Sequence, residues 1–394
     1  MPALPSRRLA PAAVLSTAAL VLAGCGGGSL SEDSGDGGDD TVTVGLVLPA
    51  SGVYEPLGVD MTRGWELYLE QNDGMLGDRE IEVVTADEGE GPDVGVPATT
   101  RVITQDQADV VVGIVNSATA LGVKEGLASS EVPLIVANAG ADDLADGSEW
   151  VWRTSFTNGG IAASLGEQVA EDVGDEPVYL MAADYAAGEE SMAGFREAFE
   201  AAGGTVAGES LTPFGTTSDY QPFLTRAQNS DAGAIYAFYA GAEAVSFVTQ
   251  YREFGAAEDL PLYGPGFLTE GGVLEAQGDA AVGVQTAMHY SNLLDTPENT
   301  EFVDAYVEAY DAQPTTYAVQ AYDAAAALDA ALATSDGTSG ADIAAALGEV
   351  GEFSDSPRGP WSFDDDHNPE QTYFLREVED VDGAPGNVVQ GELN

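Results

Sequence analysis

The amino-acid sequence predicts an α/β fold of two doubly wound, parallel-sheet lobes that are joined by a hinge. Short, continuously apolar runs alternate with helical patterns from residue 41 onward, and this alternation restarts near Phe156. Three more helical patterns follow the second series of strands, which indicates that the chain returns to the first lobe. Continuous apolar strands of this kind are typical of parallel sheets with helices on both faces.

The first lobe is predicted to begin with a strand over 41–49, whose sequence TVTVGLVLP ends at a proline. A helix is expected over 58–71, because its apolar residues recur near helical spacing. Pro92 opens the next helix, since proline suits the first turn of a helix. The other expected elements of this lobe are strands at 80–85, 108–115 and 132–137, and helices at 92–105 and 121–129.

The second lobe is predicted to repeat this pattern, with helices that are closed by glycine. Its expected elements are strands at 178–182, 232–239, 260–263 and 282–288, and helices at 188–202 and 242–254. The late helices at 298–311, 317–333 and 341–350 would be surplus there, so we assign them to the first lobe. Segments 358–363 and 372–378 are expected to form a closing hairpin on the second lobe.

These assignments give two lobes that each combine distant parts of the chain. The first lobe is expected to contain 41–155 plus 289–352, and the second 156–288 plus 353–394. The chain then crosses between the lobes several times, near Phe156 and Met288 among other places. Several crossings make a hinge, with a cleft between the lobes.

The first 40 residues predict export and anchoring. Residues 1–24 combine Arg7 and Arg8, a short apolar run and small residues before Cys25, which is typical of a lipoprotein signal peptide. Cys25 would carry the lipid and hold the protein on the outer face of the cytoplasmic membrane. The alternative is an ordinary secretory signal with an incidental cysteine. Residues 25–40 are rich in Gly, Ser and Asp, and are expected to be a disordered tether.

The charge of the chain excludes several partners. Asp and Glu number 67 against 12 Lys and Arg, and the single cysteine permits no internal disulfide. A nucleic-acid ligand requires a basic surface, and an anionic bilayer would repel this one, so membrane contact is expected through the lipid anchor alone. Such an acidic excess resembles the surfaces of halophilic proteins, in which molar salt screens the repulsion. The alternative is an acidic extracytoplasmic protein without a halophilic host.

Eight segments in collinear order resemble the type I periplasmic-binding proteins of the branched-chain amino-acid (leucine/isoleucine/valine) transporter group. They are GLVLPASGVYEPLG, ADVVVGIVNSATALGV, VPLIVANAGADDL, WRTSFTN, PFGTTSDYQPFLTRAQ, FVTQYREFG, EFVDAYVEAY and YAVQAYDAA. The resemblance implies a monomeric component of an ABC importer that closes its lobes on a small molecule and delivers it to a membrane permease. The alternative is a ligand-sensing protein that acts on a membrane receptor or regulator.

Ligands of open α/β sheets sit beyond the carboxyl ends of the strands. Asn116 and Ser117 follow the third strand, and the helix that begins there can offer backbone N–H groups and the Ser117 hydroxyl to a carboxylate. Ser117 could instead serve as a helix cap. Asn138, Ala139 and Gly140 form the loop after the fourth strand, where small residues permit close approach of a ligand or simply form a turn.

The second lobe is expected to contribute Tyr185, Gly241 and Phe267 from its own strand ends, while Tyr54 follows the first strand. These aromatic residues suit an apolar or aromatic ligand, or they serve as core packing.

Three departures from the pattern of the amino-acid-binding relatives change the expected ligand. Their loop threonine corresponds to Gly140, their acidic partner of the ligand ammonium falls near Phe267, and their first-loop tyrosine falls near Leu57. All three losses disfavour a zwitterion. An apolar or aromatic carboxylate, or an amide-like solute, fits better than a branched-chain amino acid.

An enzyme is the weaker alternative. The two histidines, His289 and His367, have no sequence neighbours that suit a zinc site, and no nucleophile elbow or P-loop occurs. The acidic run at 364–368 lacks the spacing of a calcium loop and is expected to be a solvated turn. The sequence therefore predicts no catalytic residue, no metal and no cofactor.

Overall fold

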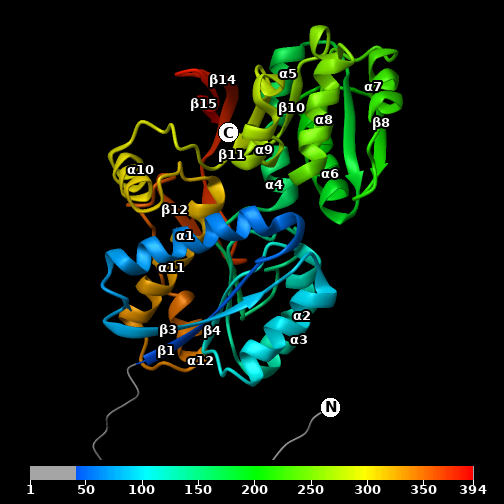
Figure 1. Cartoon of the computed structure of the whole chain (residues 1–394). Coiled ribbons are helices and arrows are strands. Elements are labelled where there is room, and N and C mark those ends of the chain that lie inside the picture. Colours follow the sequence, from blue (N-terminus) through cyan, green and yellow to red (C-terminus); the bar gives the residue numbers. More distant parts are fainter. Residues whose placement is uncertain (1–40, 394) are drawn as a thin grey trace, which may run out of the picture. The chain divides into compact units, whose positions relative to one another are not determined.

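The computed structural model describes residues 41–393. The predicted signal peptide over 1–24, the predicted lipidation site Cys25 and the predicted tether over 25–40 lie outside the described residues. Two main sheets, of six and seven strands, contain most of the strands of the described chain (Figure 1). No helix within 41–393 is both long and apolar enough to cross a bilayer.

The first sheet has the strand order β2-β3-β1-β4-β5-β6, and all its pairs are parallel except the short β2–β3 pair. Its strands are β1 (Thr41–Leu48), β2 (Met75–Leu76), β3 (Arg79–Asp87), β4 (Val110–Gly113), β5 (Leu134–Val136) and β6 (Val151–Arg153). The central strands are rich in buried β-branched residues, which suits a sheet with both faces covered.

Helices cover both faces of this sheet. They are α1 (Glu55–Gln71), α2 (Pro92–Thr104), α3 (Ser117–Ser130), α11 (Thr316–Thr334) and α12 (Gly340–Leu347), with the 3-10 turn η1 (Gly52–Tyr54) ahead of α1. Helix α10 (Pro297–Tyr310) packs outside them, against α1 and α11. Val44 of β1 shares a core with Trp65 of α1, whereas Val47 shares the opposite core with Val102 of α2. Alternate side chains along β1 therefore pack against the helices on opposite faces of the sheet.

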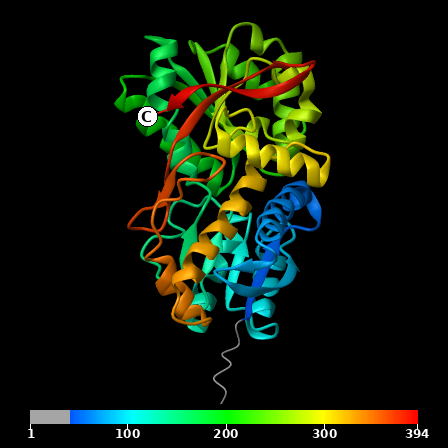
Figure 2. The same cartoon turned by 90° about the vertical axis from the view of Figure 1, so that its left-hand side faces the viewer.

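The late helices pack against the first sheet's own helices. Figure 2 shows α11 beside α1. A Cβ atom at Gly64 would lie 2.0 Å from the Ala318 carbonyl oxygen, so glycine permits this close approach. The Tyr310 hydroxyl at the end of α10 donates to the Arg63 carbonyl oxygen of α1 at 3.0 Å.

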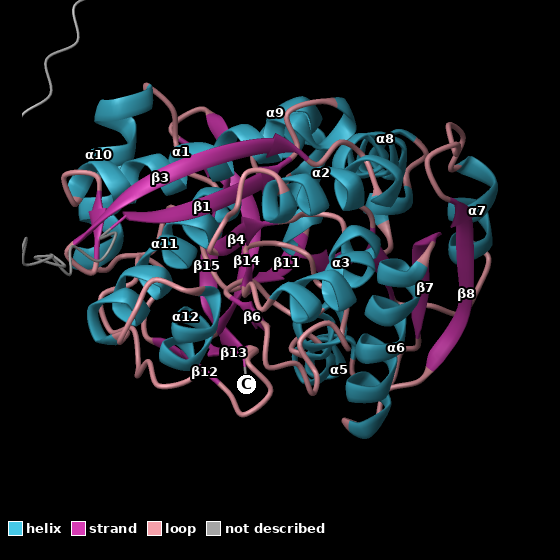
Figure 3. Ribbon diagram, turned by 90° about the horizontal axis from the view of Figure 1, so that it is seen from below, coloured by secondary structure: helices cyan, strands magenta, loops and turns pink. Residues whose placement is uncertain are grey.

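The second sheet has the order β15-β14-β11-β10-β9-β7-β8, in which the last five strands are parallel. Figure 3 shows β8 at its edge beside β7. Its strands are β7 (Val178–Asp184), β8 (Val206–Pro213), β9 (Ala234–Phe238), β10 (Leu262–Pro265), β11 (Gln285–Met288), β14 (Tyr373–Val381) and β15 (Ala384–Leu393). The accompanying helices are α4 (Asn158–Ala163), α5 (Gly166–Val173), α6 (Ala186–Ala201), α7 (Gln221–Gln228), α8 (Gly241–Glu253) and α9 (Gly272–Gln277), with η2 (Ala256–Glu258), η3 (Gly266–Thr269) and η4 (Gly278–Ala281).

The predicted α/β class with parallel sheets is confirmed, but the predicted closing hairpin is wrong. Segment 358–363 contributes β12 (Trp361–Phe363), which pairs with β13 (Pro369–Gln371) in a separate small sheet. Strand β14 pairs instead with β11 and with β15, the last strand of the chain. The pairing differs because β14 meets β11, which is distant in the sequence, and the local pattern contains no information on that contact. Strands β6 and β8 were also not predicted.

Candidate functional site

A cavity of about 240 Å³ lies where the carboxyl ends of strands from both main sheets meet. Its wall contains residues that follow β1, β4 and β5 of the first sheet and β7, β9 and β10 of the second. This is the position that ligands occupy in open α/β sheets. The structure brings together seven of the nine residues proposed from the sequence, namely Tyr54, Asn116, Ser117, Asn138, Gly140, Tyr185 and Phe267.

The other two proposed residues, Ala139 and Gly241, lie outside the cavity wall. Ala139 is 1% exposed, and its N–H donates to the Ile114 carbonyl oxygen at 3.0 Å, so it belongs to the core of the first sheet. Gly241 begins α8 with a φ of +55°, and its predecessor Ala240 reaches the wall instead. The sequence located both loops, but it did not indicate which residue of each loop turns inward.

The first residues of helix α3 are part of the cavity wall. Asn116 is the N-cap residue, since its Oδ1 accepts from the Thr119 N–H at 3.1 Å, so the cap is not Ser117. Ser117 Oγ accepts from the Ala141 N–H at 3.1 Å, which leaves the hydroxyl proton available. Within residues 41–393 the N–H groups of Ser117 and Ala118 have no hydrogen-bond acceptor, as is usual in the first turn of a helix. These groups can bind an anion.

Glu88 stabilises the segment just before α3, and it was not identified from the sequence. It follows β3 and is fully buried, and its carboxylate accepts from the N–H groups of Val115 and Asn116, each at 2.8 Å. Burial raises the pKa of Glu88 to about 7, while the two backbone hydrogen bonds act in the opposite direction. An acidic residue directly after a strand, in the run ADEGEGP, is the signal that could have indicated it.

Aromatic rings form much of the remaining wall. Phe156, Phe238 and Tyr317 join the three aromatic residues proposed from the sequence. The Phe267 ring lies 4.7 Å from the Phe156 ring and 6.2 Å from the Phe238 ring, measured between centroids. Burial raises the pKa of Tyr54 to about 12 and that of Tyr185 well above its ordinary value, so both phenols stay neutral. Leu57, where the relatives' tyrosine was expected to fall, is also part of the wall.

Two asparagine side chains complete the polar part of the wall. Asn138 Nδ2 donates to Gln320 Oε1 at 2.8 Å, and Asn158 Nδ2 donates to Glu190 Oε2 at 2.8 Å. Asn158 was not proposed from the sequence, because it follows no long strand and begins a helix of only six residues. Its position in the crossing after β6 brings it to the cavity.

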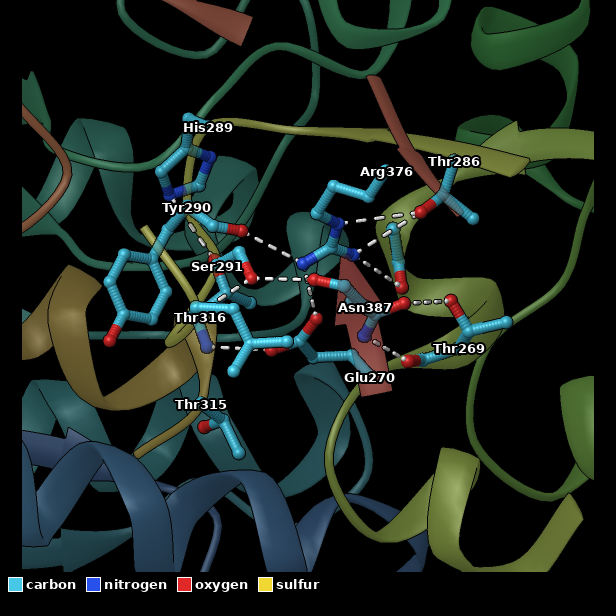
Figure 4. A network of polar contacts seen from close by, with 12 residues as sticks. Thr269, Glu270, Thr286, His289, Tyr290, Ser291, Thr315, Thr316, Arg376 and Asn387 are labelled. Atoms are coloured by element: carbon cyan, nitrogen blue, oxygen red, sulfur yellow. Dashed lines mark hydrogen bonds and ion pairs between the residues drawn. The ribbon is translucent and has the colours of Figure 1, made fainter. Parts of the chain in front are cut away.

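Among residues 41–393, no Asp, Glu, Lys or Arg is part of the cavity wall. The first acidic residue after Phe267 in the sequence is Glu270, whose carboxylate contacts Arg376 and Thr316 and is not part of the cavity wall (Figure 4). Its Oε2 accepts from Arg376 Nη1 at 2.9 Å, and its Oε1 accepts from the Thr316 N–H at the start of α11 at 2.8 Å. Arg376 Nη1 also donates to the Tyr290 carbonyl oxygen at 2.8 Å. Glu270 thus connects Arg376 of β14 to the first residue of α11, outside the cavity wall.

Neither histidine is placed as a metal ligand. His289 is buried beside Thr316 and Gln320, and burial lowers its pKa well below the ordinary value. The His367 ring stacks on Trp152, with ring centroids 4.5 Å apart. The acidic run around it is a turn in which Asp364 Oδ1 accepts from the N–H groups of Asp366 and Asn368. In the part of the chain that the structure describes, no group of three or more His, Cys, Asp or Glu residues could hold a metal ion.

A cavity at the strand ends of two α/β sheets is typical of a ligand-binding protein. A comparison with family models identifies the family. The model described as "Periplasmic binding protein" matches residues 41–384. The chain belongs to this family. A Leu/Ile/Val-binding protein homologue of Brucella melitensis is 30% identical over 350 residues, which cover 87% of this chain and 89% of the relative.

Solved structures of ABC-transporter solute-binding proteins are similar to this periplasmic binding protein. One from R. palustris, in complex with benzoate, is 36% identical with a TM-score of 0.81, over 89% of this chain and 96% of that one. Another, from Rhodopseudomonas palustris BisB5 in complex with 3,4-dihydroxybenzoic acid, is 30% identical with a TM-score of 0.84. That match covers 90% of this chain and 98% of the other.

Proposed function

We propose that this chain is the extracytoplasmic solute-binding component of an ABC importer and that it captures a small aromatic monocarboxylate. The observation that supports this ligand class best is the composition of the cavity. An uncharged wall of aromatic rings adjoins the start of α3, where the N–H groups of Ser117 and Ala118 and the Ser117 hydroxyl are available to an anion. The benzoate and dihydroxybenzoate complexes of the two similar proteins support the same class.

The carboxylate of such a ligand fits the start of α3 on physical grounds. Two backbone N–H groups and the positive end of the helix dipole favour a negative charge at this point. The aromatic body then lies against Phe156, Phe238 and Phe267, where apolar surface of ligand and protein is removed from water.

An amino acid fits this cavity less well because its ammonium group would lose water without gaining a carboxylate. Burying an ammonium group without an ion-pair partner costs several kcal/mol. Glu270 does not meet this need, since Arg376 and the Thr316 N–H already hold its carboxylate.

The remaining parts of the proposal concern how the protein works in the cell. We place it on the outer face of the cytoplasmic membrane, anchored through Cys25, as a monomer that hands its ligand to a membrane permease. We assign it no cofactor and no catalytic activity. The sensing alternative differs in its partner, since a receptor or regulator would replace the permease.

Isothermal titration with two groups of ligands tests the ligand class. Benzoate and 3-phenylpropanoate are expected to bind, with heats that saturate at one ligand per chain. Leucine, isoleucine and valine are expected to give no saturable heat. Binding of leucine or valine without binding of either acid would overturn the assignment.

A further inference from the structure

Asn158 has an unusual position for a residue of the cavity wall. It is 3% exposed, and its backbone N–H donates to the Gly140 carbonyl oxygen at 2.7 Å. Its side-chain Oδ1 would lie 2.4 Å from a Cβ atom at Gly140. The side-chain oxygen of Asn158 and the Phe156 ring, whose Cε2 atom would also lie 2.4 Å away, together occupy the space that a side chain at position 140 would fill. Glycine at this position admits an amide oxygen to the cavity.

Glu190 on α6 sets the orientation of this amide. Asn158 Nδ2 donates to Glu190 Oε2 at 2.8 Å, and an ionised carboxylate accepts hydrogen bonds but cannot donate them. Turning the amide over would place two oxygen atoms against each other. The nitrogen is thus fixed on Glu190, and Oδ1 is left as an acceptor.

This acceptor has no donor within residues 41–393. Among the described residues, no N–H or O–H group donates to Asn158 Oδ1, although the residue is almost fully buried. Asn138 in the neighbouring loop is arranged in the same way, since its Nδ2 donates to Gln320 Oε1 at 2.8 Å and its Oδ1 receives no donor from residues 41–393. Neither oxygen belongs to the fully buried side-chain atoms that lack a hydrogen-bond partner, so both stay open to solvent. A ligand that covers such an acceptor without donating to it is penalised relative to a ligand that brings a donor.

We propose that Asn158, held by Glu190 and admitted by Gly140, determines specificity by accepting a hydrogen bond from a hydroxyl group on the ligand's ring. This proposal rests on the proposed function and narrows it to hydroxylated aromatic acids. The wall then has opposite polarity at two places. The start of α3 offers donors to the carboxylate, and the asparagine offers an acceptor to the hydroxyl.

Dissociation constants of three kinds of ligand separate a donated hydrogen bond from a simple gain in size. The probes are benzoate, the 3- and 4-hydroxybenzoates, and the matching methoxybenzoates, which can accept but not donate. The full chain is expected to bind at least one hydroxybenzoate about tenfold more tightly than benzoate and than its methoxy counterpart, which corresponds to one good hydrogen bond.

Three substitutions test the residues. Asn158→Leu removes the acceptor at similar size, and Glu190→Gln offers an N–H that permits the amide to turn over. Gly140→Ala places a methyl group 2.4 Å from both Asn158 Oδ1 and Phe156 Cε2, so it displaces the amide together with part of the aromatic wall. In each, the ratio of the benzoate to the hydroxybenzoate dissociation constant should fall toward one, whatever the absolute affinity for benzoate. Gly126→Ala is the matched control, because a Cβ atom there meets nothing within 4 Å, and its ratio should equal that of the wild type.

The outcomes distinguish this inference from the proposed function. If benzoate binds and a hydroxyl group adds nothing, or if the preference survives Asn158→Leu, the specificity proposal falls and the proposed function stands. If no aromatic acid binds, both fall together.

Discussion

Glu88 shows how a single buried carboxylate can organise the loop to which we assign the ligand's carboxylate. It accepts from the N–H groups of Val115 and Asn116 and so fixes the chain just before α3, where Ser117 and Ala118 present theirs. The carboxylate lies on the protein side of the loop, which keeps the wall uncharged. Because the carboxyl group is buried, its charged form is disfavoured and the pKa of Glu88 is raised to about 7.

That raised pKa predicts a pH dependence of stability. The folded state retains the Glu88 proton up to about pH 7, whereas the unfolded chain releases it near the ordinary value of 4.5. The folded state therefore binds more protons between these values, and the contribution of Glu88 to stability declines as pH rises through this window. The full shift corresponds to roughly 3 kcal/mol.

Urea unfolding at several pH values between 4.5 and 7.5 measures this effect. Glu88→Gln should remove part of the decline that the wild type shows, and exposed Glu125→Gln should not. Wild-type and Glu88→Gln curves with the same pH dependence would show that Glu88 titrates normally.

The residues of the site illustrate what a sequence can and cannot indicate. Asn116 and Ser117 were predicted because they directly follow a buried strand and begin a helix. Asn158 was missed, since its role depends on Glu190 and Gly140, which meet it only in the folded chain. Ala139 was misplaced because a loop's position follows from the pattern, whereas the direction of each side chain depends on backbone angles.

Among the elements, α3 carries the largest share of the proposed carboxylate site. Its N-cap is satisfied by Asn116, so the Ser117 hydroxyl is free of that task and instead accepts from the Ala141 N–H. The hydroxyl therefore joins the start of α3 to the loop after β5, and one proton remains for a ligand.

Ser117→Ala should weaken benzoate binding by about 1.5–3 kcal/mol, which is the usual contribution of a hydrogen bond to a charged group. Ser129→Ala near the end of the same helix is the control, since the Ser129 hydroxyl donates to the Glu125 carbonyl oxygen away from the cavity. Titration calorimetry of both variants gives the comparison. An unchanged dissociation constant for Ser117→Ala would place the carboxylate elsewhere.

Element prediction succeeded where the signal is local and failed where it is not. The central strands and long helices have strong periodic patterns, and the structure contains them within a few residues of their expected bounds. The predicted strands at 358–363 and 372–378 are present as β12 and β14, but their predicted pairing is wrong because β14 pairs with the distant β11. Strand β14 also carries Arg376, which is buried although a charged residue is usually exposed. Arg376 is tolerated inside because Glu270 and the Tyr290 carbonyl oxygen accept its hydrogen bonds.

At the scale of the whole molecule, the few basic residues do little to neutralise the surface. Arg153, Arg358 and Arg376 are at most 3% exposed, and Arg358 forms a buried ion pair with Asp323 at 2.9 Å. Against 67 acidic residues, the chain has 12 basic ones, so these three reduce an already small number at the surface. Dissolved cations must supply the compensation.

If the surface is halophilic, the melting temperature of the purified protein should fall when it is moved from molar salt to dilute buffer. Repulsion between carboxylates is screened beyond ~3 Å at about 1 M salt but extends over ~30 Å at about 0.01 M. Differential scanning calorimetry across a sodium chloride series measures the change. A melting temperature that is equal or higher in dilute buffer would contradict the halophilic interpretation.

The same acidic surface also affects how fast a ligand is captured. A carboxylate ligand approaches a molecule of formal charge −55, so at low ionic strength the field slows its diffusion toward the cavity. Salt removes this barrier, and the association rate constant rises with ionic strength, opposite to the trend for partners of unlike charge. If the ligand is the proposed carboxylate, the protein therefore captures it faster in brine than in fresh water.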